Sequence, residues 1–287
     1  MIYSMTGFAR VEKQSHVGTM VLELRSVNHR YLDISFRMPE ELRAFETQLR
    51  ERLQQQLSRG KIECNLRFTP ASGATEVLVD EVAVKALLEA VKRTEDQMSN
   101  AARISALEVL RWPGIIQEAA PDENALGALL LETLDAGLGR LLEMRAQEGA
   151  RMAELLHQRL AKIRDIAAQV RKRRPEVVAA MREKLQARLA QLDVDADPGR
   201  LEQEMAMIAQ KLDVDEELDR LDSHVRAATE VLERNEPVGR RLDFLMQEFN
   251  REANTLGSKS SDAETTEAAV ELKVLIEQMR EQVQNIE

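Results

Sequence analysis

The chain is poor in cysteine, in aromatic residues and in the two residues that most often interrupt helices. Its 287 residues include 1 cysteine, 12 glycines and 7 prolines, and only 3% are aromatic. The single cysteine, Cys64, excludes an internal disulfide framework and a zinc site built from several cysteines. Because apolar residues make up 44% and charged residues 31%, we expect an aliphatic core and long solvated helices rather than a compact sheet protein.

Signals for export or membrane insertion and an excess of positive charge are also missing. The first residues lack a basic region followed by an apolar stretch, and no apolar run approaches the ~18 residues needed to cross a bilayer. We therefore expect a soluble, cytoplasmic protein. The net charge of −10 by itself argues against a nucleic-acid partner. Arginines nevertheless gather in residues 25–67, where they can bind phosphate or form an ordinary charged surface.

The first 80 residues have the pattern of a small α/β unit. A helix is predicted from Pro39, a residue favoured in the first turn, to a stop at Gly60. Alternating polar and apolar residues predict strands on both sides of this helix, at 2–10, 17–27, 31–37 and 61–68. The expected order is β-β-β-α-β, and we expect the second and third strands to form a hairpin.

Long helices are predicted for the rest of the chain. Apolar residues recur at three- and four-residue spacing, and Pro175 is expected to break or kink the longest run. The predicted helices are 122–174, 176–192, 199–234, 239–256 and 263–284. Since helices gain most of their stability by packing an apolar face, we expect these to find partners in a homo-oligomer.

The expected fold class is therefore α+β and mostly α, with a small N-terminal sheet-and-helix domain followed by a long-helix domain. We divide the chain into an N-terminal α/β domain (1–80), a helical middle segment (81–198) and a C-terminal helical domain (199–287).

The densest group of polar residues lies between residues 213 and 259, on two of the predicted helices. Glu248 and Glu252 are four residues apart and share a helix face, where two carboxylates can hold a divalent ion. Arg220 and His224 have the same spacing on the preceding helix. A helical hairpin would bring the two faces together. A solvated ladder of salt bridges would give the same pattern.

A second polar group, Asn28-His29-Arg30-Tyr31, follows the strand predicted at 17–27. These side chains can all contact phosphate, ribose or an unstacked base. An ordinary polar turn is the alternative interpretation.

Four runs carry a resemblance to a known family: SMTGFAR at 4–10, LRSVNHRYLD at 24–33, RGKI at 59–62 and DFLMQEFNREANTLGSK at 243–259. They resemble the YicC family, and because they lie near both ends, the resemblance spans the whole chain. It implies an N-terminal YicC-like domain and a C-terminal helical domain. It also implies an endoribonuclease with divalent-metal dependence and a hexameric assembly around a central opening.

We expect a metal-assisted hydrolase that cleaves RNA phosphodiester bonds in RNA turnover, with Mn²⁺ or Mg²⁺ as cofactor and other RNA-degradation proteins as partners. The residues are assigned from their spacing inside the motifs. The expected catalytic residues are Glu248, Glu252, His224 and Arg251. The expected metal ligands are Glu248, Glu252 and Asp219. The expected RNA-binding residues are Arg25, Asn28, His29, Arg30, Arg220, Arg241 and Lys259.

Two alternatives use the same residues. In the first, the RNA 2′-OH attacks without a metal, with His29 or His224 as the base, and the product ends in a 2′,3′-cyclic phosphate. In the second, the chain is a non-catalytic RNA-binding adaptor that delivers RNA to another nuclease. A purely structural helical oligomer would leave both polar groups without a use.

Overall fold

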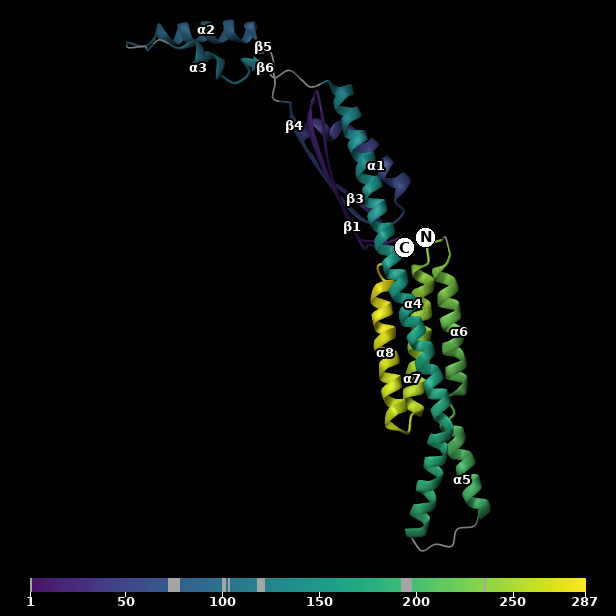
Figure 1. Cartoon of the computed structure of the whole chain (residues 1–287). Coiled ribbons are helices and arrows are strands. Elements are labelled where there is room, and N and C mark those ends of the chain that lie inside the picture. Colours follow the sequence, from purple (N-terminus) through teal and green to yellow (C-terminus); the bar gives the residue numbers. More distant parts are fainter. Residues whose placement is uncertain are drawn as a thin grey trace.

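A computed structural model describes residues 2–71, 78–99, 102, 104–117, 122–191, 198–234 and 236–287. It confirms the α+β, mostly α, fold class, because a small N-terminal sheet is followed by long helices (Figure 1). No helix in these described ranges is both long and apolar enough to span a membrane.

The N-terminal sheet has four strands in the order β1-β2-β4-β3. The strands are β1 (Gly7–Ser15), β2 (Gly18–Val27), β3 (Leu32–Arg37) and β4 (Gly60–Pro70). The predicted hairpin between the second and third strands is wrong, because β2 pairs with β1 and β4, and β3 pairs in parallel with β4. Parallel neighbours need a crossover connection, which the helical segment between β3 and β4 supplies. The predicted chain order β-β-β-α-β is confirmed.

The sheet buries one face against two helical segments. The inward side chains of its two central strands are at most 2% exposed, and they are Met20, Leu22, Leu24, Ile62, Cys64 and Leu66. The segment after Pro39 begins as a 3₁₀ helix (Glu40–Phe45) and continues as α1 (Glu46–Gln56). Leu49 and Leu53 of α1 join this core. Burial raises the pKa of the Cys64 thiol to about 12, so this cysteine is a core residue rather than a reactive one.

Helix α4 (Glu123–Gln191) is 69 residues long, roughly 100 Å at 1.5 Å per residue. Its first half packs on the sheet, and its middle joins the C-terminal bundle (Figure 1). Of the two outcomes predicted for Pro175, a break is wrong, because α4 continues through this residue, whereas a kink stays a prediction. Ion pairs hold the two residues before the proline, with Arg173 2.9 Å from Asp262 and Arg174 2.9 Å from Asp213. Since α4 belongs to both cores, the three-part division of the chain stays a prediction.

The second core is a bundle of α4 with three C-terminal helices, α6 (Asp215–Leu232), α7 (Gly239–Lys259) and α8 (Ala263–Val283). The predicted single helix at 199–234 is in fact two, α5 (Pro198–Lys211) and α6. Between these helices, the carboxylate of Asp213 accepts the backbone N–H of Asp215 at 3.1 Å, a local bond that competes with a continuous helix.

The segment 78–117 forms a small unit that buries little apolar surface. It contains β5 (Leu78–Val79), α2 (Glu81–Glu95), α3 (Ala106–Leu110) and β6 (Ile116–Gln117). No residue of α2 is buried. Large apolar side chains are exposed along the segment, among them Val82, Leu88, Met98, Leu107, Trp112 and Ile116. An amphipathic helix with an open apolar face is typical of a segment that packs against another molecule.

The two ends of the chain lie together where the sheet meets the bundle (Figure 1). Tyr3 and Glu287 exchange backbone hydrogen bonds of 3.3 and 2.9 Å. Arg145 of α4 is 2% exposed, donates to the carbonyl of Ser4 and forms an ion pair with the Glu287 side chain. The junction is thus a polar contact that ties the N-terminal and C-terminal parts together.

Candidate functional site

Helices α6 and α7 form the hairpin that the sequence predicts, and a polar seam runs along their contact. Leu218 and Leu221 of α6 and Leu242 and Phe249 of α7 are buried in the bundle. The polar residues of the seam lie beside these apolar stripes, at the edge where the two helices meet. Helical spacing therefore explains both the packing and the position of the polar groups.

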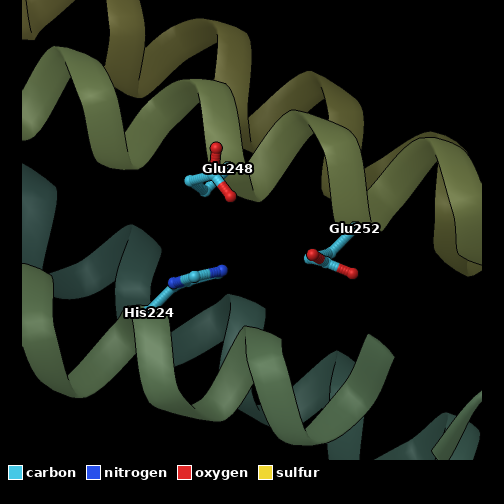
Figure 2. Close-up of side chains that lie close together, drawn as sticks. All are labelled: His224, Glu248 and Glu252. Carbon is cyan, nitrogen blue, oxygen red and sulfur yellow. The ribbon is translucent and has the colours of Figure 1, made fainter. Parts of the chain in front are cut away.

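At the centre of the seam, His224 of α6 faces Glu248 and Glu252 of α7 (Figure 2). One ligand atom from each residue lies within 4.8 Å of the others. Glu252 is only 2% exposed, whereas His224 and Glu248 are half-buried. The imidazole packs edge-on against Phe249, with 5.7 Å between ring centroids. Its Nε2 atom is buried and has no hydrogen-bond partner among the described residues.

Arg220 supplies a positive charge beside this cluster. Its Nη1 lies 3.5 Å from Oε1 of Glu252, and its Nη2 donates to Glu216, one turn earlier on α6. The hydrogen bond and charge of Glu216, followed by the charge of Glu252, raise the pKa of Arg220. The guanidinium therefore stays charged and offsets the buried Glu252 carboxylate. Glu216 is not among the predicted site residues, although its i, i+4 spacing to Arg220 is visible in the sequence.

The seam ends at a second ion pair, between Lys259 and Glu217. The Lys259 ammonium donates to Oε1 of Glu217 at 2.9 Å and to the carbonyl oxygen of Asp213 at 2.8 Å. Glu217 is 5% exposed, so this ion pair is partly buried. It joins the start of α6 to the end of α7, at the end of the hairpin opposite its connecting turn. The sequence predicted that Lys259 binds RNA. In the structure its ammonium group is engaged with the protein.

Both halves of the chain match models of one known protein family. Residues 2–154 match the model of the family described as "Endoribonuclease YicC-like, N-terminal region", and residues 170–287 match "Endoribonuclease YicC-like, C-terminal". The chain belongs to the YicC-like endoribonuclease family.

Two relatives match this YicC-like chain over the full length of both sequences. It is 45% identical over 288 residues to the "Probable endoribonuclease YicC" of Haemophilus influenzae. It is 34% identical over 294 residues to a protein of the same name from Clostridioides difficile (strain 630). The resemblance noted in the four sequence runs is therefore confirmed across the whole chain.

Three residues predicted for the site lie elsewhere in this YicC-like fold. Asp219 faces α4, where it pairs with Arg171 at 2.7 Å, so it is not part of the His224 cluster. Arg251 is exposed and lines a groove between α7 and α8. Arg241 lies in the first turn of α7, 3.9 Å from Glu236. Asp219 and Arg251 turn toward other neighbours, whereas Arg241 lies about two helical turns before Glu248 along α7.

The predicted N-terminal RNA-binding residues form a separate surface. The amide of Asn28 donates to the carbonyl of Gln284 at 2.6 Å, so this residue holds the end of α8. Arg25, His29 and Arg30 are exposed. Gly239, the first residue of α7, lies beside Ile286 at the same junction.

Glu248 is nine residues into α7, which is about 13 Å along the helix axis. The structure therefore does not bring the N-terminal residues into contact with the His224 cluster.

Proposed function

We propose that this chain is an endoribonuclease that cleaves RNA phosphodiester bonds with a divalent metal ion held by His224, Glu248 and Glu252. The observation that carries the proposal is the convergence of an imidazole and two carboxylates from two helices, with ligand atoms within 4.8 Å of one another. The names of the two relatives support the reaction and the substrate class. Asp219, which the sequence predicted as a ligand, pairs with Arg171 and is not part of this metal site.

The chemistry of these side chains fits a metal. Two metal–ligand bonds of ~2.0–2.4 Å span about 4–4.8 Å end to end, so the three side chains can reach a shared ion. The buried Nε2 of His224 has no other partner among the described residues. Because Mg²⁺ is bound mainly through carboxylates and water, the imidazole favours Mn²⁺ over Mg²⁺.

The metal ion and the side chains around the cluster would have different roles in cleavage. When bound, the metal ion lowers the pKa of a bound water and offsets the charge of the phosphate. Arg220 is 46% exposed and permanently charged, so its outer N–H groups can hold a non-bridging phosphate oxygen. Glu216 and Glu252 fix the direction of that guanidinium.

We propose that the exposed N-terminal surface binds RNA outside the cleavage point. Arg25, His29 and Arg30 are exposed there, and the Arg30 guanidinium lies 5.2 Å from the centre of the Tyr31 ring. Tyr31 is 64% exposed, which suits stacking of an unpaired base. Arg241 and Lys259 form ion pairs within the protein, and Asn28 bonds to the end of α8. These three residues are therefore not part of the proposed RNA-binding surface.

We also propose that the protein acts as a homo-oligomer in the cytoplasm, together with other RNA-degradation proteins. The open apolar face of the segment 78–117 supports assembly between copies. The size of six subunits rests on the family resemblance alone.

The test is a double substitution, Glu248→Gln with Glu252→Gln, assayed on a labelled single-stranded RNA with Mn²⁺ or Mg²⁺. We expect cleavage to fall at least a hundredfold and to stop in EDTA. The matched control is Glu267→Gln with Glu271→Gln, an exposed pair of the same spacing on α8, which should retain full activity. Mn²⁺ binding, followed by electron paramagnetic resonance, should be lost only in the first variant.

Other outcomes would support the alternatives. Full cleavage in EDTA by the Glu248→Gln, Glu252→Gln variant, with products ending in a 2′,3′-cyclic phosphate, would replace the metal mechanism with attack by the 2′-OH. Salt-dependent RNA binding without cleavage by the wild type would support the adaptor. Loss of cleavage in the double variant also excludes a contaminating nuclease.

A further inference from the structure

A groove of about 440 Å³ lies between α7 and α8, whereas the His224 cluster lies between α6 and α7. This volume is within the range of ligand sites, ~300–1,000 Å³. The polar residues that line the groove are Gln247, Asn250, Arg251, Asn254, Thr255 and Arg280. None of these lining residues carries a carboxylate, and the nearby Asp243 carboxylate accepts a hydrogen bond from Gln247 at 3.2 Å. The groove is therefore suited to a ligand that carries negative charge and hydrogen-bonding groups.

The amides form a row on one face of α7, because Gln247, Asn250 and Asn254 recur three and four residues apart. The amide nitrogen of Asn254 donates to Oδ1 of Asn250 at 3.0 Å, which holds the two side chains together. This pair still presents one amide oxygen and one amide nitrogen, whichever of the two side chains donates. An adjacent acceptor and donor complement the edge of an unpaired base.

Two guanidinium groups lie beside the amide row. Arg251 is exposed and has no ion pair within the part of the chain that the structure describes. Arg280 is 3.8 Å from Glu277, yet its Nε atom is buried without a hydrogen-bond partner in the same part of the chain. The Arg280 side chain is 43% exposed and lines the groove, so its outer N–H groups can donate to a phosphate oxygen.

We propose that the α7–α8 groove binds an unpaired nucleotide of the RNA, with Asn250 and Asn254 on the base edge and Arg251 and Arg280 on the phosphate. This inference rests on the proposed function. Arg251 is three residues after Glu248, so their Cβ atoms are ~5–6 Å apart on the helix surface. One RNA strand lying across α7 can therefore reach the groove and the His224 cluster together, and the groove positions the strand for cleavage.

The test compares two ligands in EDTA, where cleavage stops: a labelled single-stranded oligoribonucleotide and an abasic oligonucleotide of the same length. In the variant Asn250→Ala, Asn254→Ala, we expect RNA to bind about tenfold more weakly or worse, with no change for the abasic strand. A bidentate amide–base contact is worth ~1–3 kcal/mol, and ~1.4 kcal/mol is tenfold in affinity. Fluorescence anisotropy gives both affinities.

The matched control is Gln147→Ala with Gln158→Ala, two amides on α4 that bond to glutamates one turn earlier. It should bind both ligands as the wild type does. Alanine is favourable in a helix, and equal thermal unfolding curves would show that the groove variant is folded.

Three results would overturn the inference. The first is unchanged RNA binding by the groove variant, and the second is an equal loss for the RNA and abasic strands. The third is a change of mass in light scattering, which would mean that a second copy of the chain covers the groove. If the wild type binds no RNA at all, the proposed function itself fails. If the wild type binds RNA and the groove variant binds it equally well, only the proposal for the groove fails.

Discussion

Glu252 is the residue on which the candidate site depends most, because it holds a carboxylate at a position only 2% exposed. A buried charge is costly unless it is paired. Arg220 supplies the pairing at 3.5 Å but is itself half-exposed, so solvent weakens the interaction. A divalent ion at the same place would replace this pairing with a stronger one. Substitutions of Arg220 and Glu252 should therefore have coupled effects on the free energy of unfolding as well as on activity.

Arg220→Ala tests this coupling. Without a metal ion, we expect the free energy of unfolding to fall measurably, because Glu252 loses its counter-charge. Arg220→Ala with Glu252→Gln should recover most of the loss, since the charge that needed a partner is gone. Urea unfolding of the wild type, both single variants and the double variant in EDTA measures the coupling. Additive losses would show that the two side chains do not interact.

At the scale of single elements, α4 has to bring the chain's N-terminus very close to its own backbone. A Cβ at Gly149 would lie 2.1 Å from the carbonyl oxygen of Ile2, whereas a Cβ at Gly139 in the same helix meets nothing within 4 Å. The two glycines have the same intrinsic effect on a helix but different surroundings. At Gly139 only helix propensity acts on a substitution by alanine. At Gly149 the contact with Ile2 opposes the gain in helix propensity.

Gly139→Ala should stabilise the protein by up to ~1 kcal/mol, the difference in helix propensity. Gly149→Ala should destabilise it, because the added methyl group displaces the N-terminal segment from α4. Thermal unfolding of the two variants measures both effects. A gain in stability at both positions would mean that the N-terminal segment does not pack on α4.

The start of α8 depends on Asp262. Its side chain accepts the backbone N–H of Thr265 at 3.2 Å and the Nε–H of Arg173 at 2.9 Å. Burial opposes ionisation of Asp262, but hydrogen bonds from Thr265 and Arg173 outweigh it and lower its pKa. The carboxylate therefore stabilises the folded state above its ordinary pKa of about 3.9 and loses this effect as the pH falls through the lowered value.

Asp262→Ala removes both the cap and the ion pair and should cost about 1–2 kcal/mol at pH 7. Asp262→Asn keeps a capping oxygen and loses only the charge, so its loss should be smaller. The difference between the wild type and Asp262→Asn should shrink only as the pH falls through the lowered pKa of Asp262, where the wild-type carboxyl becomes neutral. Urea unfolding at pH 7 and in the range below pH 4 checks the sign. A difference that persists at the lowest pH would exclude the charge as its cause.

At the scale of the whole molecule, two cores share one long helix, and the chain termini lock the junction between them. Half of the large apolar residues that are exposed in the described part of the chain lie in the segment 78–117, outside the two cores. Apolar surface of this kind is what an assembly between copies would bury.

Leu107→Ser with Trp112→Ser should therefore lower the mass of the assembly in light scattering, because both side chains are more than half exposed, at 68% and 58%. Val270→Ser with Val274→Ser on α8 is the matched control, since these valines are 56% and 51% exposed but lie on the bundle. The control should keep the wild-type mass. Loss of mass in the control alone would place the interface on the bundle instead.

The sequence by itself determined which residues share a face. The i, i+4 spacing of Arg220 with His224 and of Glu248 with Glu252 predicted one polar seam, and the alternating strands predicted a small sheet before the long helices. The same local patterns identified the family, because its motifs lie on continuous runs near both ends of the chain.

Only the tertiary structure decided which neighbour each face meets. Strand alternation does not specify hydrogen-bond partners, so the place of β4 between β2 and β3 could not be predicted. Asp219 and Arg251 lie near the seam in sequence, yet one side chain turns toward α4 and the other lines the groove with α8. The physical reason is that periodicity fixes a direction around one helix, whereas packing of the whole bundle fixes what lies in that direction.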